Sequence, residues 1–176
     1  MSGHNKWSKI KNKKAVTDAQ KSKIFSKLVK FISVESKKCK GDINSPSLRS
    51  AIEKAKDANV PNDNIERAIK KGLGVGEKEM ESITYESYGP GGTALIIEAL
   101  TDNRNKAAQE IKHILSKNGF ELAVPGSALW AFRKENGEWI PNNTIPINEE
   151  DSNKLEIIIS ELEENDEVQD VYTNAE

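Results

Sequence analysis

The spacing of the apolar residues changes near Ser82, and this change is the strongest constraint on the fold. Before Ser82, apolar residues recur every three or four positions, as on the buried face of an amphipathic helix. After it, short apolar runs bounded by glycine and proline turns alternate with helical segments. The sequence therefore predicts an α+β protein with a helical domain at 1–76, a linker at 77–81 and an α/β domain at 82–176.

Three helices are predicted in the first domain. The first covers residues 16–38, and Gly41 ends it because glycine readily adopts the left-handed conformation that closes many helices. Pro46 suits the first position of the second helix, since proline lacks an N–H group that is unpaired there in any case. Pro61 starts the third helix and Gly72 ends it. The first domain is therefore expected to be a three-helix domain.

The second domain follows the order β-α-β-β-α-β from residue 93, which is the order of a ferredoxin-like α/β sandwich. A further strand at 83–88 precedes this series, and Trp130 and Phe132 fall in the third predicted strand. The predicted strands are 83–88, 93–101, 127–133, 144–147 and 168–173. One predicted helix follows Asp102, and the other begins at the acidic residues 149–151, where a helix N-terminus favours negative charge.

Charge is distributed very unevenly along the chain. Residues 1–40 hold twelve lysines and two acids, whereas residues 135–176 hold one lysine and thirteen acids. The net charge of −2 for the whole chain hides this contrast. Concentrated positive charge on one segment is typical of a protein that binds a polyanion, although a solvated basic tail gives the same pattern.

The basic residues form two candidate nucleic-acid-binding groups. Lysines neutralise phosphates, and an exposed indole or imidazole can stack on an unpaired base or lie against a ribose. On the first predicted helix, Lys23, Lys27 and Lys30 fall on one side, opposite the apolar residues. The opening segment is a basic arm, for which packing of the tryptophan against the protein's own helices is the alternative. Its candidate residues are His4, Lys6, Trp7, Lys9, Lys11, Lys13 and Lys14.

The type of basic residue favours RNA over a DNA operator. Base readout in the major groove of DNA depends largely on arginine, asparagine and glutamine, but no arginine precedes Arg49. Lysine is a point charge that fixes position on a phosphate backbone more than it specifies sequence. No helix-turn-helix motif with a clear recognition helix is readable. We therefore expect backbone and shape recognition, as on structured RNA.

The sequence offers no set of residues for catalysis. The histidines His4 and His113 lie far apart, and with the single cysteine Cys39 they do not give the spacing of a zinc site. Phosphate-binding loops and nucleophile motifs are also missing. We therefore expect no enzymatic activity, metal or cofactor, and infer no small-molecule substrate. Gly91 and Gly92 are candidate backbone contacts for an anion, although a tight turn between strands explains them equally.

The sequence also predicts a cytoplasmic protein that does not contact a membrane. No apolar run approaches the roughly 18 residues needed to span a bilayer, and the N-terminus lacks the apolar region of a signal peptide. A single cysteine forms no disulfide within the chain, which is typical of a reducing compartment.

Several segments, spread in order over nearly the whole chain, resemble the YebC/PmpR family. They are SGHNKW at 2–7, KIFSKL at 23–28, NIERAIKKG at 64–72, YESYGPGG at 85–92, TDNRN at 101–105, WIPNN at 139–143 and DEVQDVYTN at 166–174. The resemblance implies a cytoplasmic regulator of gene expression. Some members of the family are DNA-binding transcriptional regulators, and others activate translation on ribosomes, with relief of stalling at proline-rich stretches as the proposed role. It also implies a helical domain followed by two α/β domains, one inserted within the other.

The chain differs from the family in length. Members are usually longer, and the missing segment falls between residues 133 and 139, so the chain resembles a short form without the inserted domain. The preferred hypothesis is a non-enzymatic translation factor that binds ribosomal RNA. The alternatives are a DNA-binding transcriptional regulator and a protein-interaction module that pairs the basic arm with the acidic helix at 149–167.

Overall fold

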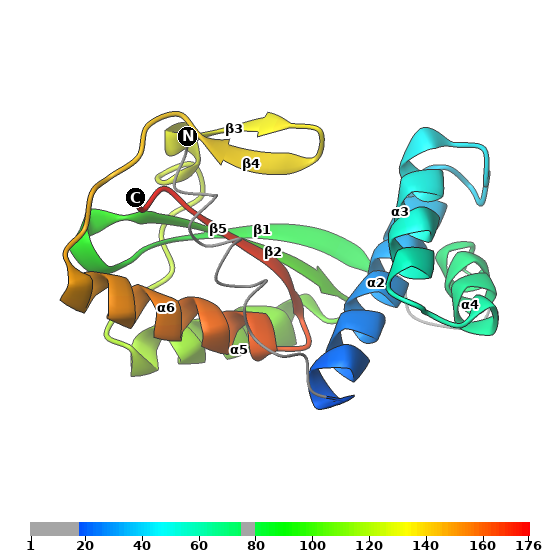
Figure 1. The fold of residues 1–176 in the computed structure, drawn as a ribbon, viewed down its shortest axis with the longest axis horizontal. Helices are drawn as coiled ribbons and strands as arrows, with labels where there is room; N and C mark the ends of the chain where they lie inside the picture. Colours follow the sequence, from blue (N-terminus) through cyan, green and yellow to red (C-terminus); the bar gives the residue numbers. More distant parts are fainter. Residues whose placement is uncertain (1–17, 75–79) are drawn as a thin grey trace. The chain divides into compact units, whose positions relative to one another are not determined.

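The structure, a computed structural model, describes residues 18–74 and 80–176 (Figure 1). It confirms the predicted fold class, an α+β protein with an N-terminal helical region and a small antiparallel sheet domain. The described residues divide into two compact units. The helical unit contains residues 18–74, 80–83 and 100–104, and the sheet unit contains residues 84–99 and 105–176. The predicted domain limits at residues 76 and 82 remain predictions.

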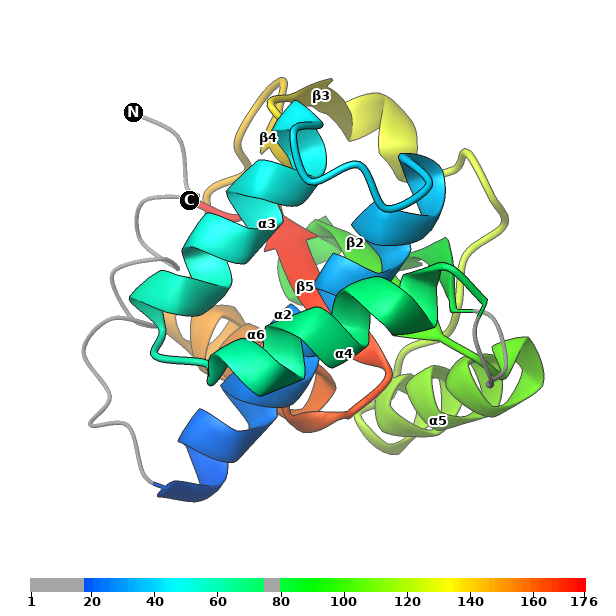
Figure 2. The same ribbon diagram turned by 90° about the vertical axis from the view of Figure 1, so that its right-hand side faces the viewer.

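The described part of the helical unit is built from α2 (Asp18–Lys38), α3 (Pro46–Asp57) and α4 (Asn62–Gly72). As predicted, Pro46 is the first residue of α3, and α4 follows Pro61 directly. Both shorter helices pack against α2 (Figure 2). Burying the apolar stripes of three amphipathic helices together removes them from water, which is the main source of their stability. The buried residues of this core are Ile32, Leu48, Ala51, Ala55, Val60, Ile65 and Ala68.

Gly72 lies where α4 approaches α2 most closely. A Cβ atom at this position would lie 2.4 Å from the carbonyl oxygen of Ser33, which is shorter than real contacts allow. Next to it, the Ser36 hydroxyl donates a hydrogen bond of 2.8 Å to the carbonyl oxygen of Ile69. The prediction that α4 ends at Gly72 is confirmed, but the glycine serves close helix packing. The left-handed conformation belongs to Gly74, with a φ of 77°.

The sheet unit contains a three-stranded sheet in the order β1-β2-β5, formed by Glu81–Tyr88, Ala94–Thr101 and Val168–Thr173. The first residues of β1 and the last of β2 belong to the helical unit. Strand β2 runs antiparallel to β5, with Leu95 opposite Thr173.

Strand β2 is buried on both faces. Its residues Leu95 and Ile97 pack against α5 (Arg104–Lys117) and α6 (Glu149–Glu164), which lie on the same side of the sheet (Figure 1). Burial on both faces explains the nearly continuous apolar sequence of this strand.

The opposite face of the sheet is covered by a second, two-stranded sheet. It is a hairpin of β3 (Phe132–Glu135) and β4 (Glu138–Pro141), and Phe132 packs on Ala94 and Ile96 of β2. The predicted order β-α-β-β-α-β is therefore present from β2 onward. Among the described strands, however, β3 and β4 pair only with each other, and β1 pairs with β2.

Two predicted strands are wrong in position. Residues 129–131 of the predicted strand 127–133 form a turn of 3₁₀ helix, and the strand starts only at residue 132. The predicted strand at 144–147 is limited to one bridge between Ile145 and Ala175. After β3, Asn136 and Gly137 have φ values of 51° and 84° and make a tight hairpin turn. The sequence after this turn therefore returns at once as β4.

Candidate nucleic-acid interface

Part of the predicted binding site lies outside the described residues. This applies to the whole basic arm, with His4, Lys6, Trp7, Lys9, Lys11, Lys13 and Lys14. The described candidates are the three lysines of α2 and the two glycines of the turn between β1 and β2. The lysines belong to the helical unit and the glycines to the sheet unit.

The lysines of α2 form a row along one side of the helix. Lys23, Lys27 and Lys30 are separated by four and three residues, which places them one above the other on a helix. The row spans about 10 Å, roughly three nucleotide steps along a helical strand. All three side chains are half-buried, and each takes part in a contact. The same side of the helix continues to Val34, which packs against Met80 and Leu100, so the row ends where α2 becomes covered.

A second group of lysines lies at the ends of α2 and α4. The close contact at Gly72 brings the last turns of these two helices together. Basic side chains at a helix C-terminus are favoured by the helix dipole. We call this group the terminal lysine cluster; its members are Lys37, Lys38, Lys40, Lys70 and Lys71.

The members of the terminal lysine cluster differ in their pairing. Lys38 is ion-paired with Glu35 at 2.7 Å, and Lys37 and Lys71 also make contacts. Lys40 and Lys70 are exposed, and no acid among the described residues pairs with them. The predicted site contained none of these five lysines, although the lysine-rich segments ahead of Gly41 and Gly72 were a visible signal. Helix ends that are distant in sequence become neighbours only through the packing of α2 on α4.

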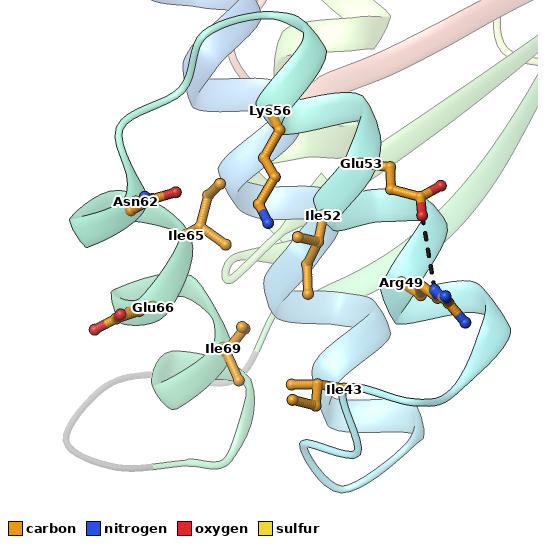
Figure 3. Close-up of a pocket in the computed structure, with 9 residues that line it drawn as sticks. All are labelled: Ile43, Arg49, Ile52, Glu53, Lys56, Asn62, Ile65, Glu66 and Ile69. Atoms are coloured by element: carbon orange, nitrogen blue, oxygen red, sulfur yellow. Dashed lines mark ion pairs between the residues drawn. The ribbon is translucent and has the colours of Figure 1, made fainter.

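The helical unit has a groove between α3 and α4. It has a volume of about 470 Å³, and Ile43, Ile52, Ile65 and Ile69 form its apolar floor. Figure 3 shows these side chains lying toward one another between the two helices. The rim carries both signs of charge, with an Arg49–Glu53 ion pair at 3.7 Å and the side chains of Lys56 and Glu66. An apolar floor with a mixed rim does not select a phosphate, so we leave the groove out of the candidate interface.

The glycine turn between β1 and β2 has a role within the fold. Gly91 and Gly92 have φ values of 69° and 76°, and the N–H groups of residues 89, 92 and 93 all donate within the turn. A Cβ atom on Gly91 would lie 2.7 Å from Ile147 and 3.4 Å from the Asp151 carboxylate. A neighbouring carboxylate is unfavourable for a bound anion. The anion contact of these glycines stays a prediction.

The remaining expectations concern metal binding, membrane contact and enzymatic activity. Within residues 18–74 and 80–176, no three His, Cys, Asp or Glu side chains gather as metal ligands would. In the same part of the chain, no helix has the length and apolar character needed to cross a bilayer. That the protein is not an enzyme stays a prediction.

Family models identify the relatives of this chain. The N-terminal domain model of the TACO1/YebC proteins matches residues 5–75, and the model of their second and third domains matches residues 80–137 and 134–175. The chain belongs to the TACO1/YebC family. This membership confirms the resemblance that the sequence segments carry.

Individual relatives agree with the family models. A protein of Thermoanaerobacter pseudethanolicus is 40% identical over 239 aligned positions, which cover 100% of this chain and 97% of the relative. A protein of Halothermothrix orenii is 49% identical over 165 positions, covering 93% of this chain and 63% of the relative. Both are named probable transcriptional regulatory proteins. The crystal structure of a conserved hypothetical protein from Aquifex aeolicus matches with a TM-score of 0.83 and 31% identity, over 90% of this chain and 91% of that one.

The length of this family member also fits the sequence prediction. The alignment with the Thermoanaerobacter protein extends over 239 positions, whereas this chain has 176 residues. The model of the second and third domains matches in two segments that overlap at residues 134–137, which are the end of β3 and the turn before β4. Both facts support a short form of the TACO1/YebC family.

Proposed function

We propose that this TACO1/YebC family member is a non-enzymatic, nucleic-acid-binding regulator of gene expression that acts as a translation factor on ribosomal RNA. The observation that carries the proposal is the concentration of positive charge in the helical unit. Residues 18–74 hold thirteen lysines and arginines against seven acids. The names of the relatives, probable transcriptional regulatory proteins, support a regulatory role.

The proposed contacts are made by lysines to phosphates. The α2 row and the terminal lysine cluster together supply eight lysines, and the basic arm supplies more. Each phosphate that a lysine neutralises releases a condensed counterion, and this release drives binding at low salt. If six lysines are engaged, the affinity falls by about 10³ between 50 and 200 mM salt. Binding of this kind is strong, salt-dependent and weakly selective for sequence.

The composition of the basic surface favours RNA. Eleven of the thirteen basic residues in 18–74 are lysines, and the two arginines are Arg49 and Arg67. Lysine lacks the rigid fork with which arginine reads guanine in the major groove of DNA. Structured RNA is recognised mainly by shape, phosphates and unpaired bases. A lysine-rich surface therefore fits ribosomal RNA better than a DNA operator.

A DNA-binding regulator is the second candidate, and one structural feature favours it. Helices α3 and α4 are joined by four residues, 58–61, which is the length of a helix-turn-helix connection. The sequence had not revealed this arrangement. However, the exposed face of α4 carries Asp63 and Glu66 beside Arg67 and Lys70. Two carboxylates on a helix that should enter the major groove weaken its attraction to phosphates.

Sedimentation of cell extracts tests the proposal. At low salt we expect the protein to migrate with ribosomal particles and to leave them as the salt concentration rises. A variant with Lys23, Lys27 and Lys30 changed to glutamine should leave the particles at lower salt than the wild type. The matched control changes three exposed lysines of the sheet unit, Lys112, Lys117 and Lys154, to glutamine and should migrate like the wild type.

Two outcomes would contradict the ribosomal proposal. The first is a wild-type protein that stays at the top of the gradient at low salt. The second is ultraviolet cross-linking in cells that recovers genomic DNA and no ribosomal RNA. Cross-linking to one promoter sequence over scrambled duplexes would support the DNA-binding alternative.

A further inference from the structure

Exposed apolar side chains gather on and beside the loop that connects α5 to β3. Val124 is 75% exposed and Trp130 is 70% exposed. Tyr88, at the end of β1, is 40% exposed, and its hydroxyl donates a hydrogen bond to the carbonyl oxygen of Ser127 in the same loop. Tryptophan is highly buried on average, so an indole that is mostly in solvent indicates a contact surface.

The loop that carries Trp130 is firmly anchored. The carboxylate of Glu86 is 3% exposed and accepts three hydrogen bonds from backbone N–H groups of the loop. The donors are Gly126 at 2.6 Å, Ala128 at 2.7 Å and Leu129 at 2.9 Å.

Trp130 itself is also held, since the Asn142 amide donates to its carbonyl oxygen at 3.1 Å. A residue on a fixed backbone loses little conformational entropy when it binds a ligand. Trp130 is therefore exposed on a preorganised support.

The charge around Trp130 differs from that of the rest of the sheet unit. Residues 84–99 and 105–176 hold seventeen acids and six basic residues, yet residues 122–134 contain no acid. Arg133 and Lys134 follow Trp130 by three and four residues, which keeps their backbones within about 14 Å of it. Both side chains are exposed, although Arg133 is ion-paired with Glu135 at 2.6 Å and the Lys134 amine lies 4.9 Å from the ring centre of Trp139. The segment 122–134, which Glu121 and Glu135 flank, is therefore less repulsive to a polyphosphate than the rest of this unit.

We propose that Trp130 is a stacking platform for an unpaired nucleotide of a single-stranded nucleic acid, with Arg133 and Lys134 beside the flanking phosphates. An indole stacks on every base, so the platform recognises the absence of pairing and does not read sequence. This inference rests on the proposed function and deepens it, because it adds an unpaired nucleotide to the feature that the protein recognises. A protein segment is the competing occupant of the same surface.

Fluorescence anisotropy with a labelled oligoadenylate tests the platform on the full-length protein. Stacking contributes about 1–3 kcal/mol per base, so Trp130→Ala should weaken binding by about 5- to 150-fold. Trp130→Phe keeps an aromatic face and should retain most of the affinity. Val124→Ser is the matched control, since it removes an equally exposed apolar side chain from the same loop and should change nothing. A fully paired RNA duplex without overhangs should bind wild type and Trp130→Ala equally.

The results separate failure of the platform from failure of the proposed function. Unchanged oligoadenylate affinity in Trp130→Ala overturns the platform alone, provided that the wild type binds duplex RNA through its lysines. A loss in Val124→Ser as large as that in Trp130→Ala also overturns it, because it indicates an apolar docking surface for protein. A wild type that binds neither RNA overturns both proposals. Because the Trp130 side chain is mostly in solvent, its variants should unfold at the wild-type temperature, which calorimetry checks.

Discussion

Replacing Glu86 by alanine tests how the loop beneath Trp130 is held. The change leaves three backbone N–H groups without their acceptor. A hydrogen bond to a charged group contributes about 1.5–3 kcal/mol, and a donor left unpaired in the interior costs about 1–3 kcal/mol. Ala128 is fully buried and Leu129 half-buried, whereas Gly126 is exposed and can turn to water. Two poorly hydrated donors therefore predict a loss of about 3–5 kcal/mol in the free energy of unfolding.

Urea unfolding followed by circular dichroism measures this loss. Glu121→Ala is the control, because Glu121 is an exposed acid just before the same loop and should change stability by less than about 0.5 kcal/mol. The loss in Glu86→Gln should lie between the losses in Glu86→Ala and Glu121→Ala, since the amide offers only one acceptor oxygen to the three donors. A loss below about 1 kcal/mol in Glu86→Ala would show that the carboxylate does not anchor the loop.

Two further changes test the packing of each unit. Gly72→Ala should lower the free energy of unfolding, measured with urea, by about 1–3 kcal/mol. The clash with the Ser33 carbonyl should outweigh the gain in helix propensity, which is about 1 kcal/mol. A more stable variant would refute the close approach of α4 to α2. Burial, followed by the Asp170 charge, raises the pKa of Tyr172 in the folded protein. The hydroxyl therefore loses its proton at lower pH in the unfolded state than in the folded state, so the free energy of unfolding should fall above about pH 10. In Tyr172→Phe this fall with pH should be less steep. An equally steep fall in both proteins would contradict the prediction.

Much of the fold was predictable because its signals are local. The helices of the first domain show a clear 3.6-residue period, and Pro46 marks the start of α3. The side chain of Asn148 caps α6 by accepting a hydrogen bond of 2.8 Å from the Asp151 N–H, just ahead of the predicted acidic start. By contrast, β3 and β4 have few apolar residues, and the sequence did not reveal that the turn at Asn136 and Gly137 joins two paired strands. In short polar strands the alternation of apolar and polar residues is too brief to predict where the strand begins and ends.

The candidate site was less predictable because it depends on contacts between distant residues. The terminal lysine cluster exists because Gly72 lets α4 lie against Ser33 and Ser36 of α2. The exposure of Trp130 was also hidden in the sequence. An indole within an apolar run such as Ala128–Phe132 normally predicts a buried strand, whereas this segment lies in a loop anchored by Glu86 and its indole is exposed.

The salt dependence of RNA binding is the most direct test of the central claim, that the helical unit binds a polyphosphate through its lysines. It should be measured for the wild type and for a variant in which the five residues of the terminal lysine cluster are changed to glutamine. Each engaged lysine contributes about 0.7–0.9 to the slope of log affinity against log salt concentration. We predict a weaker affinity and a slope that is smaller by several such increments. The same affinity and slope in both proteins would contradict the claim.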